Sequence, residues 1–438
     1  MMRKKQLCIG LALSATWLKG NGWLRKDSGI ERLYMRDFYE ELALQAERAK
    51  LDFVFRPDAL ALNMGRGGNM PGSGSLDPTI LMASIAAATK HIGLVTTVST
   101  TFNPPYVVAR QLQSLHWTSS GRAGWNIVTA LAGSENFSAE AMPAAEDRYA
   151  KAQEFLEVVN KLWSSFPYDA VHIDREAGQW NGYEMIKPIR HQGKFFNVAG
   201  PLNVPEHATG TPPLFQAGAS DTGRDFAAYA ADAIFASIPD KEAGIELRYD
   251  LRRRAQKHGR NPEAIRVLPG LYFFLGKTSE EAEELYQEAH AHLNDERRLT
   301  ALQSILGIDC SQMPLDQPVT PELLQLLPDS QQAFRSRTHA KLLYRLIARE
   351  QPTLKQLLAR PEVIGSGHWT VVGTVEEVFT EIVEWYEAGA MDGIIALPGG
   401  SLQSLGLFCE ELVPMLAEKG LFRKEYAGTT LREHLGMV

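Results

Sequence analysis

The sequence predicts an α/β protein built as a (β/α)8 TIM barrel with insertions. Short apolar runs recur along the 438 residues, and amphipathic helical patterns separate most of them. Strands that alternate with helices indicate a parallel sheet. Eight parallel strands can stay open as a doubly wound sheet or close into a barrel, and we favour the barrel because closure removes both edges. The expected strands lie at 6–13, 52–58, 91–99, 124–130, 213–220, 232–238, 265–275 and 392–397.

The first apolar run, at 7–13, has the pattern of a secretory signal peptide, because a basic start precedes it and small residues follow it. The run is short, and an amphipathic stretch follows without a cleavage-type junction. We therefore interpret it as the buried first strand. A helix should follow it, because apolar side chains recur with a period near 3.6 at Ile30, Leu33, Phe38, Leu42, Ala46 and Ala49.

Two segments depart from the alternation, and we interpret both as insertions in a single domain that spans 1–438. The first, at about 166–212, carries strand-like pieces at 170–173 and 194–198 that glycine and proline interrupt. The second, at about 279–361, is mostly helical, and its prolines mark breaks. A C-terminal arm at about 420–438 completes the chain and could pack on a neighbouring subunit.

Glycine and proline dominate the stretch 60–78, directly after the second strand. It contains no GxGxxG or GxxxxGK[ST] placed between a strand and a helix, so it is a poor phosphate-binding fingerprint. We expect a mobile loop over the C-terminal face of the barrel. This loop, or the helical insertion after Leu275, is a candidate lid over the site.

Charge and cysteine content exclude several classes of function. Lys and Arg number 45 against 52 Asp and Glu, and no long run of like charge occurs, which argues against a nucleic-acid groove or a polybasic membrane surface. Cys8, Cys310 and Cys409 lie far apart, so neither a disulfide framework nor a metal site is expected. No apolar stretch reaches the roughly 20 residues of a membrane span. A cytoplasmic location is the simplest expectation.

The residues expected at the C-terminal ends of the strands are mostly neutral hydrogen-bonding groups. A barrel places its ligand at this end. Carboxylates are few, and no nucleophile has a base beside it, so we assign no catalytic residue and expect a cofactor site instead. The candidates are Asp58, Thr97, Ser99, Asn126, Thr129 and Ser220.

The segment 216–225 is the clearest local signal for an anion site. Ser220 is a natural N-cap for the helix that follows. The free amides of Asp221 and Thr222 at that helix start could bind a phosphate monoester, although an ordinary capped helix has the same pattern. Arg148 or Tyr149, at the start of an earlier helix, could reach a phosphate oxygen, or this segment could be a solvated acidic first turn.

Histidines and arginines give weaker signals. His191, His207 and His368 lie in irregular segments, where we expect exposure and assign no catalytic role. Arg25, Arg56 and Arg66 are candidate anchors for a carboxylated substrate, although surface charge explains Arg25 and Arg66 as well.

Taken together, these motifs resemble a known family. The segment 121–129, GRAGWNIVT, is similar to the signature of flavin-dependent monooxygenases typified by the nitrilotriacetate monooxygenase large component, within the bacterial luciferase-like superfamily. Segments 92–101, 148–149, 216–225 and 420–435 also resemble family motifs, in the expected order. The resemblance covers essentially the whole chain.

The resemblance implies a luciferase-like (β/α)8 barrel that binds FMN. It implies a two-component enzyme, in which a separate NAD(P)H-dependent flavin reductase supplies reduced FMN and the barrel uses O2 to oxygenate a small organic substrate, with C–N or C–S cleavage common. By resemblance, Ser220, the Asp221 amide and Tyr149 hold the FMN phosphate. Asp58, Thr97 and Asn126 contact the flavin and its ribityl chain.

The resemblance also implies self-association, as a homodimer or homotetramer. One departure concerns Ala145, which stands where family members often carry a histidine four residues before the motif tyrosine. Two alternatives remain open: a deazaflavin-dependent oxidoreductase of the same fold, and a non-catalytic flavin-binding protein.

Overall fold

The computed structural model describes residues 6–14, 16–62, 71, 74–130, 132–137, 142–180, 182–218, 220–330, 337–364 and 367–437. The expected glycine-rich loop therefore lies largely outside the described residues. No helix in the described part of the chain is both long enough and apolar enough to cross a membrane.

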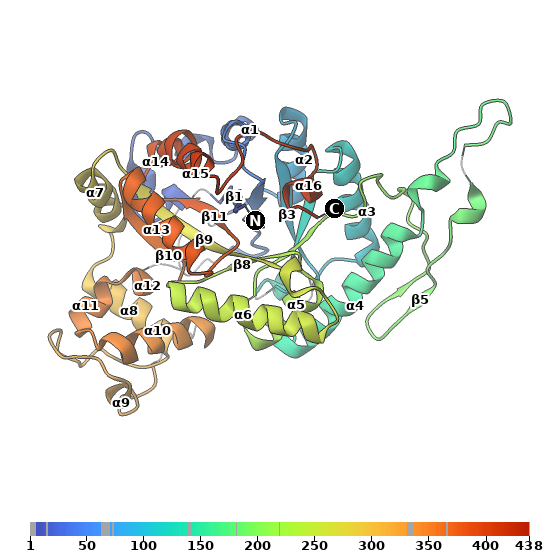
Figure 1. Cartoon of the computed structure of the whole chain (residues 1–438). Helices are drawn as coiled ribbons and strands as arrows, with labels where there is room; N and C mark the ends of the chain where they lie inside the picture. The colour runs from blue at the N-terminus through green and yellow to red at the C-terminus, as the bar shows by residue number, and fades with distance from the viewer. Residues whose placement is uncertain are drawn as a thin grey trace.

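The core of the fold is a closed parallel sheet (Figure 1). The described strands are β1 Cys8–Ala12, β2 Phe53–Arg56, β3 Gly93–Ser99, β4 Ala123–Val128, β5 His191–Gln192, β6 Asn197–Val198, β7 Leu214–Gln216, β8 Ala233–Ala236, β9 Arg266–Leu275, β10 Trp369–Gly373 and β11 Gly393–Pro398. Within the described residues, neighbours pair in the order β11, β1, β2, β3, β4, β7, β8 and β9, and β9 returns to β11. The (β/α)8 barrel and its eight expected strands are confirmed.

Strand β10 was not predicted. It runs parallel to the second half of β9, where Trp369 pairs with Leu271 and Gly373 with Leu275. The first half of β9 pairs with β8, which ends at Ala236. Because β9 is much longer than β8, its C-terminal half leaves an edge, and β10 covers it.

Helices surround the barrel, as Figure 1 shows. The helix expected after the first strand is α1, which buries Phe38, Leu42 and Ala46. The described α-helices are α1 Arg36–Arg48, α2 Pro78–Ala88, α3 Pro105–Thr118, α4 Ala145–Ser164, α5 Asp221–Ala230, α6 Lys241–Lys257, α7 Ser279–His290, α8 Asp295–Leu306, α9 Pro321–Leu324, α10 Arg337–Glu350, α11 Leu354–Ala359, α12 Pro361–Ile364, α13 Val375–Glu387, α14 Leu402–Leu407, α15 Val413–Glu418 and α16 Leu431–His434.

The two faces of each barrel strand bury different partners. On β2, Phe53 and Phe55 belong to the cluster that fills the barrel interior, whereas Val54 packs in the layer between strands and helices. Strand geometry requires this alternation. Gly10 on β1 leaves the space that the Phe53 ring occupies, since a Cβ there would overlap the ring.

The segment 166–212 extends away from the barrel and contains the antiparallel pair β5 and β6 (Figure 1). Glu154 of α4 anchors this hairpin, because its carboxylate accepts hydrogen bonds from the amides of Phe195 (3.0 Å) and Phe196 (2.9 Å) and contacts His191 Nε2 at 3.1 Å. The His191 side chain is only 7% exposed, so the expectation that it is exposed is wrong.

The prediction of a strand-like piece at 170–173 is also wrong. A 3-10 turn covers Tyr168–Ala170, and Ile173 is exposed. Asp174 then accepts hydrogen bonds from the amides of Glu176 and Ala177 and closes a turn. Aspartate side chains compete with strand pairing in this way.

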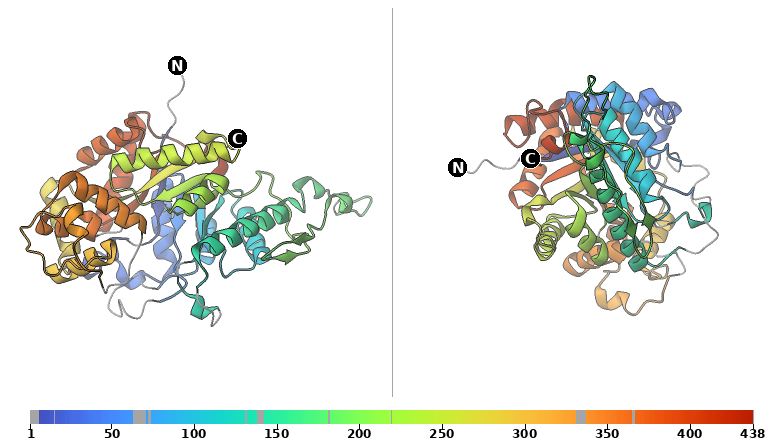
Figure 2. Two further views of the ribbon diagram at one scale, coloured as in Figure 1. Left: turned by 90° about the horizontal axis from the view of Figure 1, so that it is seen from below. Right: turned by 90° about the vertical axis from the view of Figure 1, so that its right-hand side faces the viewer.

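The segment 279–361 contains two different parts. Helix α7 packs against β9 and β10, next to the barrel. Helices α8 to α12 supply a separate apolar cluster that includes Leu302, Leu343 and Leu357. Figure 2 shows these helices and the β5 hairpin at opposite ends of the molecule.

The C-terminal segment closes the N-terminal end of its own barrel. Leu431 and Leu435, in and after α16, belong to the interior cluster. Arg423 forms an ion pair with Asp52, which is fully buried and also accepts the amide of Ile9 at 2.7 Å. The expected arm at 420–438 therefore contacts its own barrel. Its packing on a neighbouring subunit stays a prediction.

Replacement of Arg423 by alanine tests this closure. Burial raises the pKa of Asp52, and the guanidinium opposes that effect. Loss of Arg423 removes the cation that pairs directly with this buried carboxylate, so we expect the free energy of unfolding in urea at pH 7 to fall by about 3 kcal/mol. Lys424→Ala, at an exposed neighbour, is the control. A loss for Arg423→Ala no larger than for this control would contradict the assignment.

Candidate active site at the C-terminal end of the barrel

Thr97 and Asn126 form the polar centre of the barrel mouth. They are register partners on β3 and β4, and both are at least 97% buried. The Asn126 amide donates to the Thr97 hydroxyl at 2.9 Å, and that hydroxyl donates to the Arg56 carbonyl at 2.7 Å. Oδ1 of Asn126 is buried and has no hydrogen-bond partner among the described residues. An unpaired buried acceptor is costly, so this oxygen is suited to a ligand N–H.

Apolar rings line the interior of the same barrel. Phe55 of β2 contacts Phe235 of β8 with ring centroids 5.5 Å apart, and both belong to or pack on the interior cluster. Asp58 follows β2 and is half-buried. Burial raises the pKa of Asp58 above its ordinary value, although the hydrogen bond that its carboxylate accepts from the Ala59 amide lowers it.

A second group of predicted residues forms a narrow cradle beside β7. A Cβ at Gly218 would overlap Nε2 of Gln216 and lie 3.1 Å from the Tyr149 hydroxyl. A Cβ at Gly223 would lie 2.8 Å from the same hydroxyl and 3.1 Å from Oγ of Ser220. Gln216 is 2% exposed, and its Oε1 has no described partner. The two glycines therefore let the Gln216 amide and the Tyr149 hydroxyl lie close to the backbone at the start of α5.

Helix α5 begins at this cradle. The Ser220 hydroxyl accepts the Gly223 amide at 3.1 Å, which confirms the predicted N-cap. The amides of Asp221 and Thr222 lie in the first turn, where intrahelical acceptors are absent. The Tyr149 hydroxyl, the α5 amides and the helix dipole therefore converge on a place suited to an anion.

The structure adds His368 to the site. Its ring stacks on Phe235 (5.1 Å between centroids), and a Cβ at Gly270 would lie 2.6 Å from its Nδ1. That nitrogen is buried and has no described partner. Burial lowers the pKa of His368 to about 3, so the imidazole is neutral near pH 7. The expectation of an exposed histidine is wrong, because the apolar run that follows is strand β10, which brings His368 to β8 and β9.

The arginines proposed as substrate anchors have other roles where they are described. Arg56 follows Phe55 and faces the helix layer, where it donates to the Leu13 carbonyl and to Ser75 and lies over the Tyr39 ring. Arg25 pairs with Asp27 (3.0 Å) and Glu288 (2.6 Å). Arg66 lies outside the described residues.

His207 also has a packing role. It is half-buried, against the expectation of exposure, and its ring contacts those of His116 and Trp117. Among the residues that the structure describes, no group of three histidine, cysteine or acidic side chains is placed to hold a metal ion.

Comparison with known proteins agrees with this arrangement. A family model described as luciferase-like monooxygenase matches residues 34–392. The N-acetyl-S-(2-succino)cysteine monooxygenase of Bacillus subtilis (strain 168) is 36% identical over 439 residues, covering 99% of this chain and 97% of that protein. Nitrilotriacetate monooxygenase component A of Aminobacter aminovorans is 36% identical over 452 residues, covering 100% and 98%.

A solved structure extends the likeness to three dimensions. The crystal structure of riboflavin lyase (RcaE) with modified FMN and substrate riboflavin superposes with a TM-score of 0.81 at 30% identity, covering 99% of this chain and 96% of that chain.

The protonation of His368 can be measured directly. Since burial beside Phe235 disfavours the charged ring, we expect its NMR signals in 13C-histidine-labelled protein to stay those of a neutral imidazole from pH 8 down to about pH 4.5. The variant His368→Asn assigns the signal. A titration midpoint near 6.5, the ordinary value for histidine, would contradict the burial of this ring.

Proposed function

This chain belongs to the luciferase-like monooxygenase family, and on that premise we propose that it oxygenates a small organic substrate with O2 and reduced FMN. The observation that carries the proposal is the presence, at one end of the barrel, of an anion cradle at α5 and a buried polar pair, Thr97 and Asn126. The cradle suits a phosphate monoester, and the polar pair suits the polar edge of a flavin ring.

The described residues fit FMN in two independent respects. The glycines at 218 and 223 allow the Tyr149 hydroxyl to lie beside the start of α5, in a position that a Cβ at either residue would crowd. The acceptors Oδ1 of Asn126 and Oε1 of Gln216 are buried and without described partners. A dinucleotide is not required, because the cradle offers one helix N-terminus for one phosphate.

We assign the residues as follows. Tyr149, Ser220 and the amide of Asp221 bind the phosphate, and Asp58, Thr97 and Asn126 contact the flavin ring and ribityl chain. Reduced FMN supplies the electrons that activate O2 when it is bound. The Thr97 hydroxyl holds the Asn126 amide in one orientation, so that its free oxygen is positioned before a ligand arrives.

The surroundings suit a reaction that water would divert. Phe55 and Phe235 present apolar rings at the mouth, and His368, held neutral by burial, adds a polar nitrogen without a charge. We propose that this nitrogen hydrogen-bonds the substrate or the flavin. Exclusion of water from the site limits wasteful side reactions of the activated oxygen.

The partners follow from the family. A separate NAD(P)H-dependent flavin reductase supplies reduced FMN, as the name "component A" suggests for the Aminobacter relative. The two named relatives act on a nitrogen compound and a sulfur compound, which supports a substrate cleaved at C–N or C–S. We further propose a cytoplasmic homodimer or homotetramer. Ala145, exposed at the start of α4, offers the cofactor one polar contact fewer than a histidine would.

The proposed activity is tested by anaerobic titration with reduced FMN and with a reduced deazaflavin, followed by addition of 18O2 and a panel of amine and thioether polycarboxylates. We expect tighter binding of reduced FMN and, with a flavin reductase and NAD(P)H present, one 18O atom in the product. Preference for the deazaflavin would favour the alternative oxidoreductase. Flavin binding without O2-dependent product formation across the panel would favour a non-catalytic protein.

The phosphate cradle is tested by Gly223→Ala. Alanine is the better helix former, so the fold should persist, but the added Cβ, 2.8 Å from the Tyr149 hydroxyl, narrows the cradle. We expect the Kd for FMN, measured by flavin fluorescence, to rise about tenfold, or about 1.4 kcal/mol, and the Kd for riboflavin to change little. Gly406→Ala in α14, where nothing lies within 4 Å of the added Cβ, is the matched control. Unchanged FMN binding would contradict the assignment of the flavin phosphate to this cradle.

A further inference from the structure

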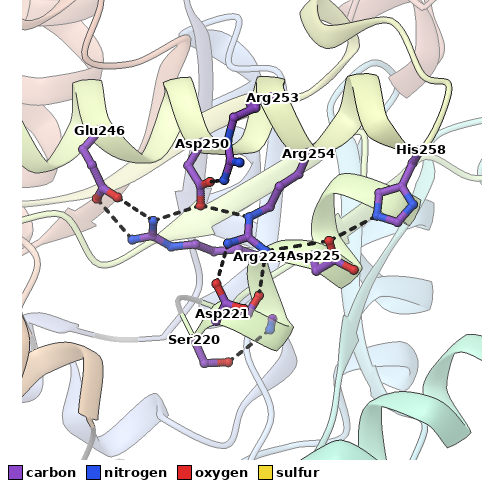
Figure 3. A network of polar contacts seen from close by, with 10 residues as sticks. Ser220, Asp221, Arg224, Asp225, Glu246, Asp250, Arg253, Arg254 and His258 are labelled. Carbon is purple, nitrogen blue, oxygen red and sulfur yellow. Dashed lines mark hydrogen bonds and ion pairs between the residues drawn. The ribbon is translucent and has the colours of Figure 1, made fainter.

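Helices α5 and α6 are joined by a network of charged side chains that reaches the anion cradle (Figure 3). Asp250 of α6 lies at its centre and accepts hydrogen bonds from Arg253 (2.7 Å), Arg254 (3.0 Å) and Arg224 (3.2 Å). Arg254 continues the network to α5, where it pairs with the carboxylate of Asp221. The network thus reaches the first residue of the helix whose N-terminus forms the cradle.

Asp221 presents a problem for an anion site. Its amide lies in the first turn of α5, where a phosphate would bind, but its side chain carries a negative charge at the same position. The carboxylate is 88% exposed, so packing does not fix its orientation. Left free, it would repel a phosphate. It could also turn toward the helix N-terminus and occupy the favourable position itself, since aspartate is stabilised there.

Arg254 counters both effects. Its side chain is 15% exposed, and Asp250 holds its Nε at 3.0 Å, which directs the guanidinium at Asp221. The same guanidinium lies 3.7 Å from Asp225, one turn further along α5. Burial opposes the charged form of Arg254, but the hydrogen bonds to Asp221 and Asp250 raise its pKa overall, so it stays a cation.

We propose that Arg254 is a positioning residue for the flavin phosphate, which acts through Asp221 by neutralising its carboxylate and holding it away from the α5 amides. This inference rests on the proposed function. A second observation independently marks the place as a ligand site, because Gln216 is 2% exposed and brings its amide, with Oε1 unpartnered, to the Gly218 side of the cradle.

The test compares binding of FMN with binding of riboflavin, which lacks the phosphate, by anaerobic fluorescence titration of the full-length protein. In Arg254→Gln we expect the Kd for FMN to rise about tenfold, because Asp221 becomes unpaired, and the Kd for riboflavin to stay within about twofold. The loss should be greater at low salt, since screening weakens repulsion between exposed charges. Arg254→Lys, which keeps the charge, should recover part of the affinity.

The double variant Arg254→Gln/Asp221→Asn gives the sharpest readout. Without the carboxylate the arginine is not needed, so FMN affinity should return to within about threefold of the wild type, a rescue that a purely structural arginine cannot give. Arg253→Gln is the matched control, because Arg253 also pairs with Asp250 (2.7 Å) in α6, whereas the described ion pair of Asp221 is with Arg254. Its FMN affinity should match that of the wild type.

The outcomes separate this inference from the proposed function. If the wild type binds FMN more tightly than riboflavin and Arg254→Gln keeps that preference, the role of Arg254 is overturned and the phosphate site stands. If Arg254→Gln weakens the binding of FMN and of riboflavin equally, and Asp221→Asn gives no rescue, the positioning role is also overturned, in favour of a structural role for Arg254. If the wild type shows no preference for FMN, the phosphate assignment itself fails, and this inference with it.

Discussion

Strand β9 is the element on which the barrel depends. It is ten residues long, and it pairs with β8 through its first half, with β10 through its second half, and with β11 around Gly270–Phe273. These pairings close the sheet, so that the barrel strands have both edges hydrogen-bonded. Closure gives the barrel two distinct ends. The C-terminal segment seals the N-terminal end around Leu431, and the other end is left for the site.

Closure also fixes which side chains can reach that site. Because successive residues of a strand point to opposite faces, Phe55 is directed into the barrel and Arg56 toward the helices. The same rule, with the register of β3 and β4, brings Thr97 and Asn126 together inside the mouth. The result is a site whose central polar pair is uncharged, with the half-buried Asp58 after β2 and with Arg56 directed away from the barrel interior.

Charge is thus kept at the periphery of the proposed flavin site. His368 is held neutral by burial, and the side-chain hydrogen bonds of the Thr97–Asn126 pair, among the described residues, join the two residues to each other and to the Arg56 carbonyl. Two carboxylates depart from this pattern. Asp58 lies half-buried after β2, and Asp221 at the α5 cradle requires compensation, which Arg254 is placed to give. A neutral, apolar mouth beside an anion site accommodates a flavin with one phosphate better than a substrate hydrolysed by acid and base.

The sequence by itself determined the local features. Periodicity located the eight barrel strands and α1, and Ser220 identified the start of α5, because strand faces, helix stripes and caps are set by nearby residues. The motifs in 121–129 and 216–225 also identified the family. Sequence reasoning missed β10, because a five-residue run beside a helical insertion resembles a fragment of that insertion, and with β10 it missed His368.

Tertiary structure decided the contacts between distant segments. The pairing of Asn126 with Thr97, the stacking of His368 on Phe235, and the ion pair of Arg254 with Asp221 each join residues separated by 29 or more positions. Arg56 could not be placed on either face from its charge, and the packing of Leu431 and Leu435 into the chain's own barrel could not be predicted from the C-terminal segment alone. Such outcomes depend on which segments share space after closure, and local propensity contains no information on that point.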